Sequence, residues 1–163
     1  MGLLRKIRDT GRVAEPAPPP PGGEMPAAAR ELGGSAQVRC VDAGSCNGCE
    51  IEIGMAFNPV YDAERYGARL VASPRHADVL LVTGPVTRNM AAPLKATVAA
   101  AAEPRLVVAV GDCALGCGEF TGGYGLASET GAVEDLVRVD VRIPGCPPEP
   151  AAIIAGLRQV TGR

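Results

Sequence analysis

The chain has no tryptophan among its 163 residues, and aromatic residues make up only 3% of it. Proteins that bind single-stranded nucleic acid stack the bases on aromatic side chains, so this scarcity removes such a platform. The formal net charge is −2, from 16 basic and 18 acidic residues, so the chain as a whole also lacks the positive excess that attracts DNA, RNA or an anionic membrane. We therefore expect no nucleic-acid partner.

Long apolar runs are also missing. A transmembrane helix needs about 20 consecutive apolar residues, and the longest candidate, residues 96–110, is interrupted by Glu103, Pro104 and Arg105. Residues 1–8 are basic, but prolines at 18–21 stand where a secretion signal would have its apolar segment. We therefore expect no signal peptide and no membrane span, and any link to a membrane would come through partner subunits.

The composition divides the chain into two parts. Residues 1–36 are rich in Pro, Ala and Gly and predict a flexible arm with one short helix at residues 27–32. The alternative is an arm that becomes ordered on a partner. Short apolar runs begin at residue 37, and hydrophobic residues make up 47% of the chain, which is enough for one core. We expect a single domain over residues 37–163.

Five runs rich in Val, Leu and Ile are typical of strands buried on both faces of a parallel sheet. They are residues 37–41, 69–72, 79–83, 106–110 and 137–143. Helices are predicted at residues 46–57, 59–66, 93–102 and 148–160. Asn47 and Glu50 resemble a capping box at the first helix, and Pro93 is placed to open the third. The alternation predicts a doubly wound α/β fold with a parallel sheet.

Four of the six cysteines follow predicted strands, at the edge where ligands collect in a parallel sheet. Cys46 and Cys49 follow the first strand, Cys113 follows the fourth and Cys146 follows the fifth. On a helical turn, Cys46 and Cys49 would have Cβ atoms about 5–6 Å apart. One C-x2-C pair with two distant single cysteines is a ligand set typical of an iron–sulfur cube. The pattern therefore predicts electron transfer.

Three alternatives explain the cysteines differently. A structural zinc site usually has two close C-x2-4-C pairs, whereas Cys49, Cys113 and Cys146 are far apart in the sequence. A redox-active Cys46–Cys49 pair would leave the other two unexplained. Free cysteines are also often merely buried, although four at one sheet edge would be an unusual coincidence.

The remaining two cysteines are less clearly assigned. Cys40 lies inside a predicted strand, which favours a place in the core over a role as a ligand. Cys117 lies four residues after Cys113, and the residue pattern alone leaves both as candidates for one ligand position. We find no Ser/His/Asp arrangement and no nickel ligand set, so the chain is not expected to hold a complete active site.

Four sequence runs carry a family resemblance. They are SCNGCEIEI at residues 45–53, YDAERYG at 61–67, SPRHAD at 73–78 and IPGCPP at 143–148. They resemble the small subunit of multisubunit membrane-bound [NiFe] hydrogenases of the formate hydrogenlyase and energy-converting type, which is related to the B subunit of respiratory complex I. The resemblance covers about residues 37–157. It implies a flavodoxin-like fold and one [4Fe–4S] cluster bound by Cys46, Cys49, Cys113 and Cys146, with Cys117 where the family usually has Gly.

The resemblance also implies partners and a location. They are a [NiFe]-hydrogenase-like large subunit, a ferredoxin-like iron–sulfur subunit and, indirectly, membrane subunits, in a complex on the cytoplasmic face of the membrane. Complex I B subunits have two adjacent cysteines at the first site, so the separated Cys46 and Cys49 favour the hydrogenase type. The alternative is a complex I-like assembly with a quinone-reductase-like large subunit that passes electrons to quinone.

Three further residues match family positions or stand out chemically. Arg75 matches an arginine near the family's cluster, where its permanent charge would stabilise an added electron; the alternative is a surface arginine. His76, the single histidine, has a structural role or a proton-linked one. Glu52 matches an acidic position that would contact the large subunit, or it is an ordinary exposed helical residue.

Overall fold

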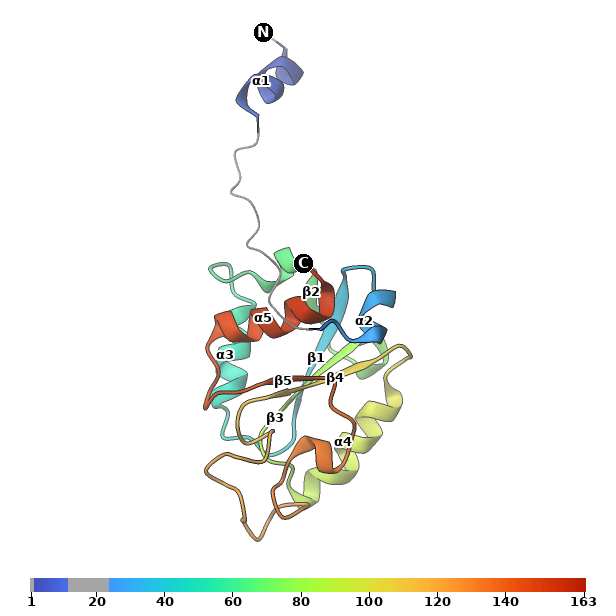
Figure 1. Cartoon of the computed structure of the whole chain (residues 1–163), viewed down its shortest axis with the longest axis vertical. Coiled ribbons are helices and arrows are strands. Elements are labelled where there is room, and N and C mark those ends of the chain that lie inside the picture. The colour runs from blue at the N-terminus through green and yellow to red at the C-terminus, as the bar shows by residue number, and fades with distance from the viewer. Residues whose placement is uncertain (1, 12–23) are drawn as a thin grey trace.

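The computed structural model describes residues 2–11 and 24–163 of the chain. Its centre is a sheet of five parallel strands in the order β2-β1-β3-β4-β5 (Figure 1). The strands are β1 (Ala36–Asp42), β2 (Ala68–Leu70), β3 (Val79–Thr83), β4 (Leu106–Val110) and β5 (Val141–Ile143). The predicted α/β fold with a parallel sheet is confirmed.

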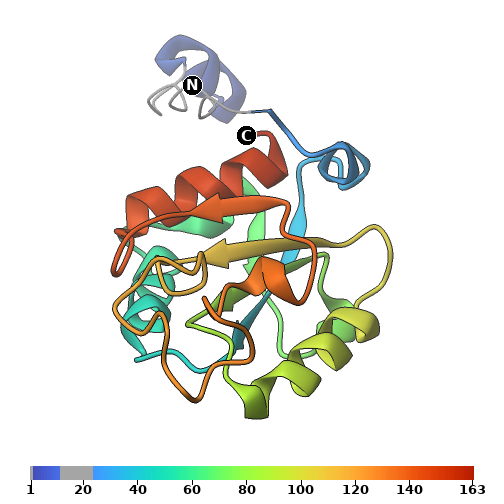
Figure 2. The same cartoon turned by 60° about the horizontal axis from the view of Figure 1, so that its bottom comes forward.

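Helices cover both faces of the sheet (Figure 2). Helices α3 (Gly48–Ala56) and α5 (Pro150–Thr161) pack on one face, and the short α2 (Ala27–Glu31) packs on this face as well. Helix α4 (Arg88–Ala100) packs on the other face. Three 3-10 turns, η1 (Ala63–Tyr66), η2 (Pro74–His76) and η3 (Val133–Asp135), lie in the connections. Helix α1 (Leu3–Thr10) has no buried residue and lies apart from these layers (Figure 1).

The two hydrophobic cores explain why the central strands are uninterrupted apolar runs. In β3, Val79 and Leu81 belong to the core beneath α3 and α5, whereas Leu80 and Val82 belong to the core beneath α4. All four side chains are fully buried. Successive side chains of a strand point to opposite faces, so a strand covered on both sides needs apolar residues at every position.

The register of the sheet aligns the carboxyl ends of four strands. Asp42 of β1 pairs with Thr83 of β3, Thr83 pairs with Val110 of β4, and Val110 pairs with Ile143 of β5. The loops that follow these strands therefore leave the sheet along one line. Three of these four loops carry the cysteines that the sequence singled out.

Several predicted element boundaries are wrong. Helix α4 begins at Arg88, and Pro93 lies inside it, where its missing N–H removes one bond to the carbonyl four residues earlier. The predicted strand at 137–143 shortens to β5, because Val137 and Val139 pack against the core on the α4 side before the chain enters the sheet. The predicted helix at 59–66 is only the turn η1. Helix α1 has no counterpart in the sequence prediction.

Candidate metal centre

Backbone hydrogen bonds join the loops that carry Cys113 and Cys146. The N–H of Gly111 donates to the carbonyl of Ile143 over 2.8 Å, and the N–H of Asp112 donates to the carbonyl of Gly145 over 2.9 Å. The Asp112 side chain completes the link, since its Oδ1 accepts the N–H of Gly145 over 2.7 Å. Asp112 therefore holds the loops of the two single cysteines together, a role that sequence analysis did not identify.

Burial and neighbouring groups shift the pKa of two of the four thiols of Cys46, Cys49, Cys113 and Cys146. Burial, followed by Glu50 and the other three cysteines, raises the pKa of Cys49 to about 12. Burial also raises the pKa of Cys113, with contributions from Cys146 and Cys46. The four thiols, which lie on three loops at the carboxyl edge of the sheet, are called the thiol group. Cys49 is buried, Cys113 is half-buried, and Cys46 and Cys146 are exposed.

This thiol group is spread out. In residues 2–11 and 24–163, no three His, Cys, Asp or Glu side chains converge closely enough to hold one metal ion. The donor chemistry and the surroundings of the sulfurs indicate which group these residues suit. Four cysteine sulfurs from three loops are the donor set of a thiolate-bound iron–sulfur cluster, whose several irons are bound by separate thiolates.

Two glycines leave room beside the less exposed sulfurs. A Cβ atom at Gly111, which has a φ of +90°, would lie 2.5 Å from the Sγ of Cys49. A Cβ atom at Gly118 would lie 2.5 Å from the Sγ of Cys113. Any other residue would push these sulfurs out of place, because heavy atoms do not approach so closely. The donor set and the glycine spaces both fit a thiolate-bound cluster.

The capping box expected from Asn47 and Glu50 is wrong. Asn47 has a φ of 72°, in the left-handed region, and its side chain makes no cap hydrogen bond. The Glu50 carboxylate instead accepts hydrogen bonds from Ser45 Oγ over 2.6 Å and from Thr83 Oγ1. Thr83 is a fully buried hydroxyl at the end of an apolar strand, and a buried hydroxyl needs a partner. A threonine at the end of an apolar strand was therefore the feature of the sequence that pointed to a polar partner, and Glu50 is that partner.

The three residues proposed to tune the cluster lie in different places. Arg75 and His76 are exposed in η2, which precedes β3, so they lie at the amino edge of the sheet, opposite the cysteines. The five residues of β3 alone span roughly 16 Å at about 3.3 Å per residue. Arg75 and His76 thus lie at the other edge of the sheet from the cysteines, and the roles expected of them stay predictions. Glu52 is half-buried on α3, and its role stays a prediction.

The two remaining cysteines differ in exposure. Cys40 of β1 is half-buried and packs against the core beneath α3 and α5, where burial raises its pKa to about 11. Cys117 is exposed, and its Sγ lies 3.5 Å from the carbonyl oxygen of Asp112, to which its N–H also donates. Its thiol therefore has a partner within its own loop.

The raised thiol pKa values predict a pH dependence of the metal-free chain. A thiol whose pKa is raised keeps its proton in the fold after the unfolded chain has lost it. The contribution of Cys49 to stability is therefore present below its ordinary value of 9.0 and is lost as the pH rises toward about 12. In urea unfolding between pH 8 and 10.5, we expect Cys49→Ser to weaken the fall of the midpoint with pH. An equal fall in parent and variant would contradict this prediction, and Cys117→Ser is the matched control.

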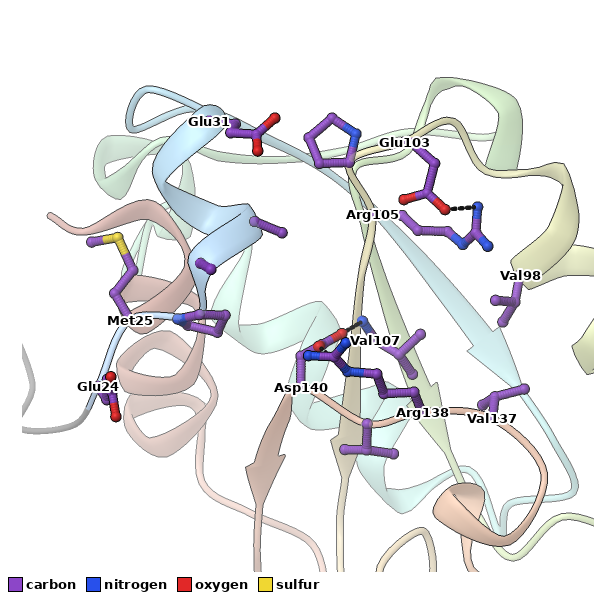
Figure 3. Close-up of a pocket in the computed structure, with 15 residues that line it drawn as sticks. Glu24, Met25, Glu31, Val98, Glu103, Arg105, Val107, Val137, Arg138 and Asp140 are labelled. Carbon is purple, nitrogen blue, oxygen red and sulfur yellow. Dashed lines mark hydrogen bonds and ion pairs between the residues drawn. The ribbon is translucent and has the colours of Figure 1, made fainter.

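A cavity of about 1050 Å³ opens at the opposite, amino edge of the sheet (Figure 3). Four of its charged groups form two ion pairs, Arg105 with Glu103 over 2.7 Å and Arg138 with Asp140 over 3.2 Å, and Glu24 and Glu31 also line it. The Asp140 carboxylate also accepts the N–H of Val107 over 2.9 Å. No cysteine lines this cavity, so it is separate from the candidate centre.

The parallel α/β sheet, with four cysteines on the loops at its carboxyl edge, suits a subunit of an oxidoreductase complex, and the comparisons place the chain in that class. A family model described as "NADH ubiquinone oxidoreductase, 20 Kd subunit" matches residues 46–160. The chain belongs to this family. The match begins at the first cysteine of the group and ends in α5, so it contains the whole candidate centre.

Relatives in the same family are hydrogenase subunits. The chain is 46% identical over 126 residues to a probable membrane-bound hydrogenase subunit of Pyrococcus furiosus, covering 77% of this chain and 74% of the relative. It is 46% identical over 128 residues to formate hydrogenlyase subunit 7 of Escherichia coli, covering 78% of this chain and 49% of that relative. The resemblance drawn from the sequence is confirmed.

Solved structures agree with the fold. A chain of the membrane-bound sulfane sulfur reductase, an archaeal respiratory membrane complex, aligns with a TM-score of 0.68 and 29% identity, covering 82% of this chain and 72% of that chain. A chain of an NAD+-reducing [NiFe]-hydrogenase aligns with a TM-score of 0.60 and 21% identity, covering 79% of this chain and 93% of that one. At that identity the second likeness concerns the fold alone.

Proposed function

We propose that the chain is an electron-transfer subunit that holds one [4Fe–4S] cluster through Cys46, Cys49, Cys113 and Cys146. It passes electrons between a [NiFe]-hydrogenase-like large subunit and a ferredoxin-like subunit. The observation that carries the proposal is the position of the four cysteines on three loops that leave the sheet at its aligned carboxyl edge. The backbone hydrogen bonds between the loops of Cys113 and Cys146 support it.

The chain's own groups have defined tasks in this proposal. The cluster, when bound, supplies one-electron redox chemistry. Cys49 anchors it on the core side, since it is buried and belongs to the same hydrophobic core as Ile53 and Ala56 of α3. Asp112 holds the loops of Cys113 and Cys146 together. The exposed Cys46 and Cys146 leave the cluster near the surface, where a partner's redox centre can approach.

Exposed apolar side chains near the thiols support a large partner at this edge. Ile51 and Met55 are exposed four residues apart on α3, the helix that carries Cys49. Phe120 and Tyr124 are exposed in the loop that follows Cys113. Apolar side chains grouped on a surface indicate a protein interface. We infer that the large subunit covers this surface and shields the cluster from water.

The separated Cys46 and Cys49 favour a hydrogenase-type partner, as does the 46% identity to two hydrogenase-complex subunits. A complex I-like assembly that reduces quinone is the second candidate, supported by the description of the family model. A zinc-stabilised interaction module is a third candidate of a different class. It rests on the thiol donor set alone, because thiolates also bind zinc.

We infer a peripheral place on the cytoplasmic face of a membrane complex. In the described part of the chain, no helix has the length and hydrophobicity needed to span a bilayer. The relative in Pyrococcus furiosus is named as a subunit of a membrane-bound hydrogenase. Partner subunits would supply the membrane spans.

Purification of the complex through a tag on this chain, without oxygen, tests the function. We expect hydrogen gas to produce the EPR signal of a reduced [4Fe–4S] cluster in the complex but not in the isolated chain, because the hydrogen chemistry belongs to the large subunit. Reduction by NADH with no response to hydrogen would favour the quinone-reducing assembly instead. A Cys146→Ser complex is the control for the origin of the signal.

A further inference from the structure

Helix α1 exposes an apolar face. Its eight residues have no buried member, and the side chains of Leu3, Leu4 and Ile7 are 73%, 82% and 58% exposed. At about 100° per residue, these three side chains lie within an arc of about 100° on one side of the helix. Exposed leucine and isoleucine gathered on one face indicate a surface that something covers.

The charges of α1 are arranged around this arc. Lys6 and Arg8 lie about 60° and 40° beyond its two edges, so one cation flanks the apolar face on each side. Arg5 lies on the opposite side and pairs with Asp9 over 3.6 Å, four residues later, while the Arg8 Nε lies 4.0 Å from the same exposed carboxylate. The helix thus has three basic residues against one acidic residue. The chain's net charge of −2 conceals this local positive charge.

We propose that α1 binds the surface of an anionic lipid membrane. Leu3, Leu4 and Ile7 enter the boundary between head groups and acyl chains, and Lys6 and Arg8 extend sideways to the lipid phosphates. Long basic side chains reach from an apolar face to a charged layer in this way. A helix with a narrow apolar face flanked by cations is the type that lies in a membrane interface.

The position of the cations favours lipid over a protein groove. A groove that accepts α1 needs to cover its apolar arc and also to provide acidic partners on both flanks, whereas an anionic bilayer supplies phosphates on every side of the helix. Three apolar side chains give only weak, reversible binding by themselves. The helix therefore adds to the attachment made by partner subunits, as a second contact on one molecule. The proposal thus adds a direct contact to the membrane link that the sequence analysis expects through partner subunits.

Sedimentation of the full chain with vesicles tests the proposal. The probes are vesicles of phosphatidylcholine with about 30% phosphatidylglycerol, and vesicles of phosphatidylcholine alone. The variants are Lys6→Gln/Arg8→Gln, Leu4→Gln/Ile7→Gln and, as the control with the same loss of charge, Arg69→Gln/Lys95→Gln. Arg69 and Lys95 are exposed on β2 and α4, within the α/β layers and away from α1.

We expect the parent chain to bind the anionic vesicles and not the neutral ones. Each basic residue near an anionic surface contributes about 1 kcal/mol, which is about fivefold in affinity, so Lys6→Gln/Arg8→Gln loses about 30-fold. Leu4→Gln/Ile7→Gln loses binding by tenfold or more, and the control stays within twofold of the parent. Absence of vesicle binding by the parent chain, or equal losses in the control, would overturn the proposal and leave a protein partner as the occupant. Iron content is measured in the same samples, so a failure of vesicle binding can be distinguished from a loss of the cluster.

Discussion

Cys146→Ser is expected to destroy or convert the four-iron cluster of the chain. The fall in iron content and the loss of the [4Fe–4S] EPR signal follow from the chemistry of the site, because a serine hydroxyl is a poor replacement for the thiolate that binds the iron. Cys146 is exposed at the end of β5, so the substitution removes a ligand without opening a cavity in the core. Iron analysis and EPR of the reduced protein measure the effect.

Cys117→Ser is the matched control, since it makes the same substitution at an exposed cysteine four residues after Cys113. Its Sγ lies 3.5 Å from the carbonyl of Asp112, and we expect this variant to keep its iron and its signal. An unaltered four-iron signal in Cys146→Ser would remove Cys146 from the ligand set. Loss of iron in Cys117→Ser would instead make Cys117 a ligand.

Gly111→Ala is expected to cause a loss of the cluster comparable to removal of a ligand. Gly111 has a φ of +90°, and an added Cβ would lie 2.5 Å from the Sγ of Cys49, the buried thiol of the group. The methyl group and the sulfur cannot both keep their places. The left-handed backbone adds a cost of about 1–2 kcal/mol in stability for any residue with a Cβ.

Gly122→Ala separates the two effects. Gly122 has a φ of +79°, yet a Cβ there would meet nothing within 4 Å. We expect this control to lose about 1–2 kcal/mol in unfolding free energy and to keep its iron. If Gly111→Ala keeps as much iron as Gly122→Ala, then Cys49, in the position that it has in the structure, is not a ligand of the cluster.

The central strands could be predicted from sequence because their environment is uniform. Residues 79–83 and 106–110 were predicted with the bounds that β3 and β4 have, since every position in them is buried. The strand predicted at 137–143 was too long, because Val137 and Val139 are apolar for a different reason: they pack against the core on the α4 side outside the sheet. Composition alone does not distinguish these two kinds of burial.

The candidate site was predictable in its cysteines but not in the residues that position them. Cys46, Cys49, Cys113 and Cys146 follow strand ends, and the topology of a parallel sheet brings such positions together. The links through Glu50 and Asp112 depend on which loops become neighbours, and that follows from the register of the sheet. The local sequence around Asn47 and Glu50 suggested a helix cap instead. In the structure the Thr83 hydroxyl donates its hydrogen bond to the Glu50 carboxylate, which is therefore not used for a cap.

Helix α1 was missed because its eight residues precede a proline-rich stretch and carry four charges. The average composition of such a segment predicts a flexible arm and not a helix. The angular arrangement of Leu3, Leu4 and Ile7 between Lys6 and Arg8 becomes evident only when the segment is placed on a helix. Arg75 shows a converse limit of the sequence, because a matching sequence position does not fix a residue's distance from the cysteines, and its tuning role stays a prediction.

Metal analysis combined with EPR of the dithionite-reduced chain, purified without oxygen, tests the central claim most directly. Four thiolate ligands for one [4Fe–4S] cluster predict about four iron atoms per chain and the signal of a reduced cluster with one unpaired spin. The signal should disappear in Cys46→Ser, Cys49→Ser, Cys113→Ser and Cys146→Ser and persist in Cys117→Ser. One zinc ion per chain, without iron and without a cluster signal, would contradict the claim.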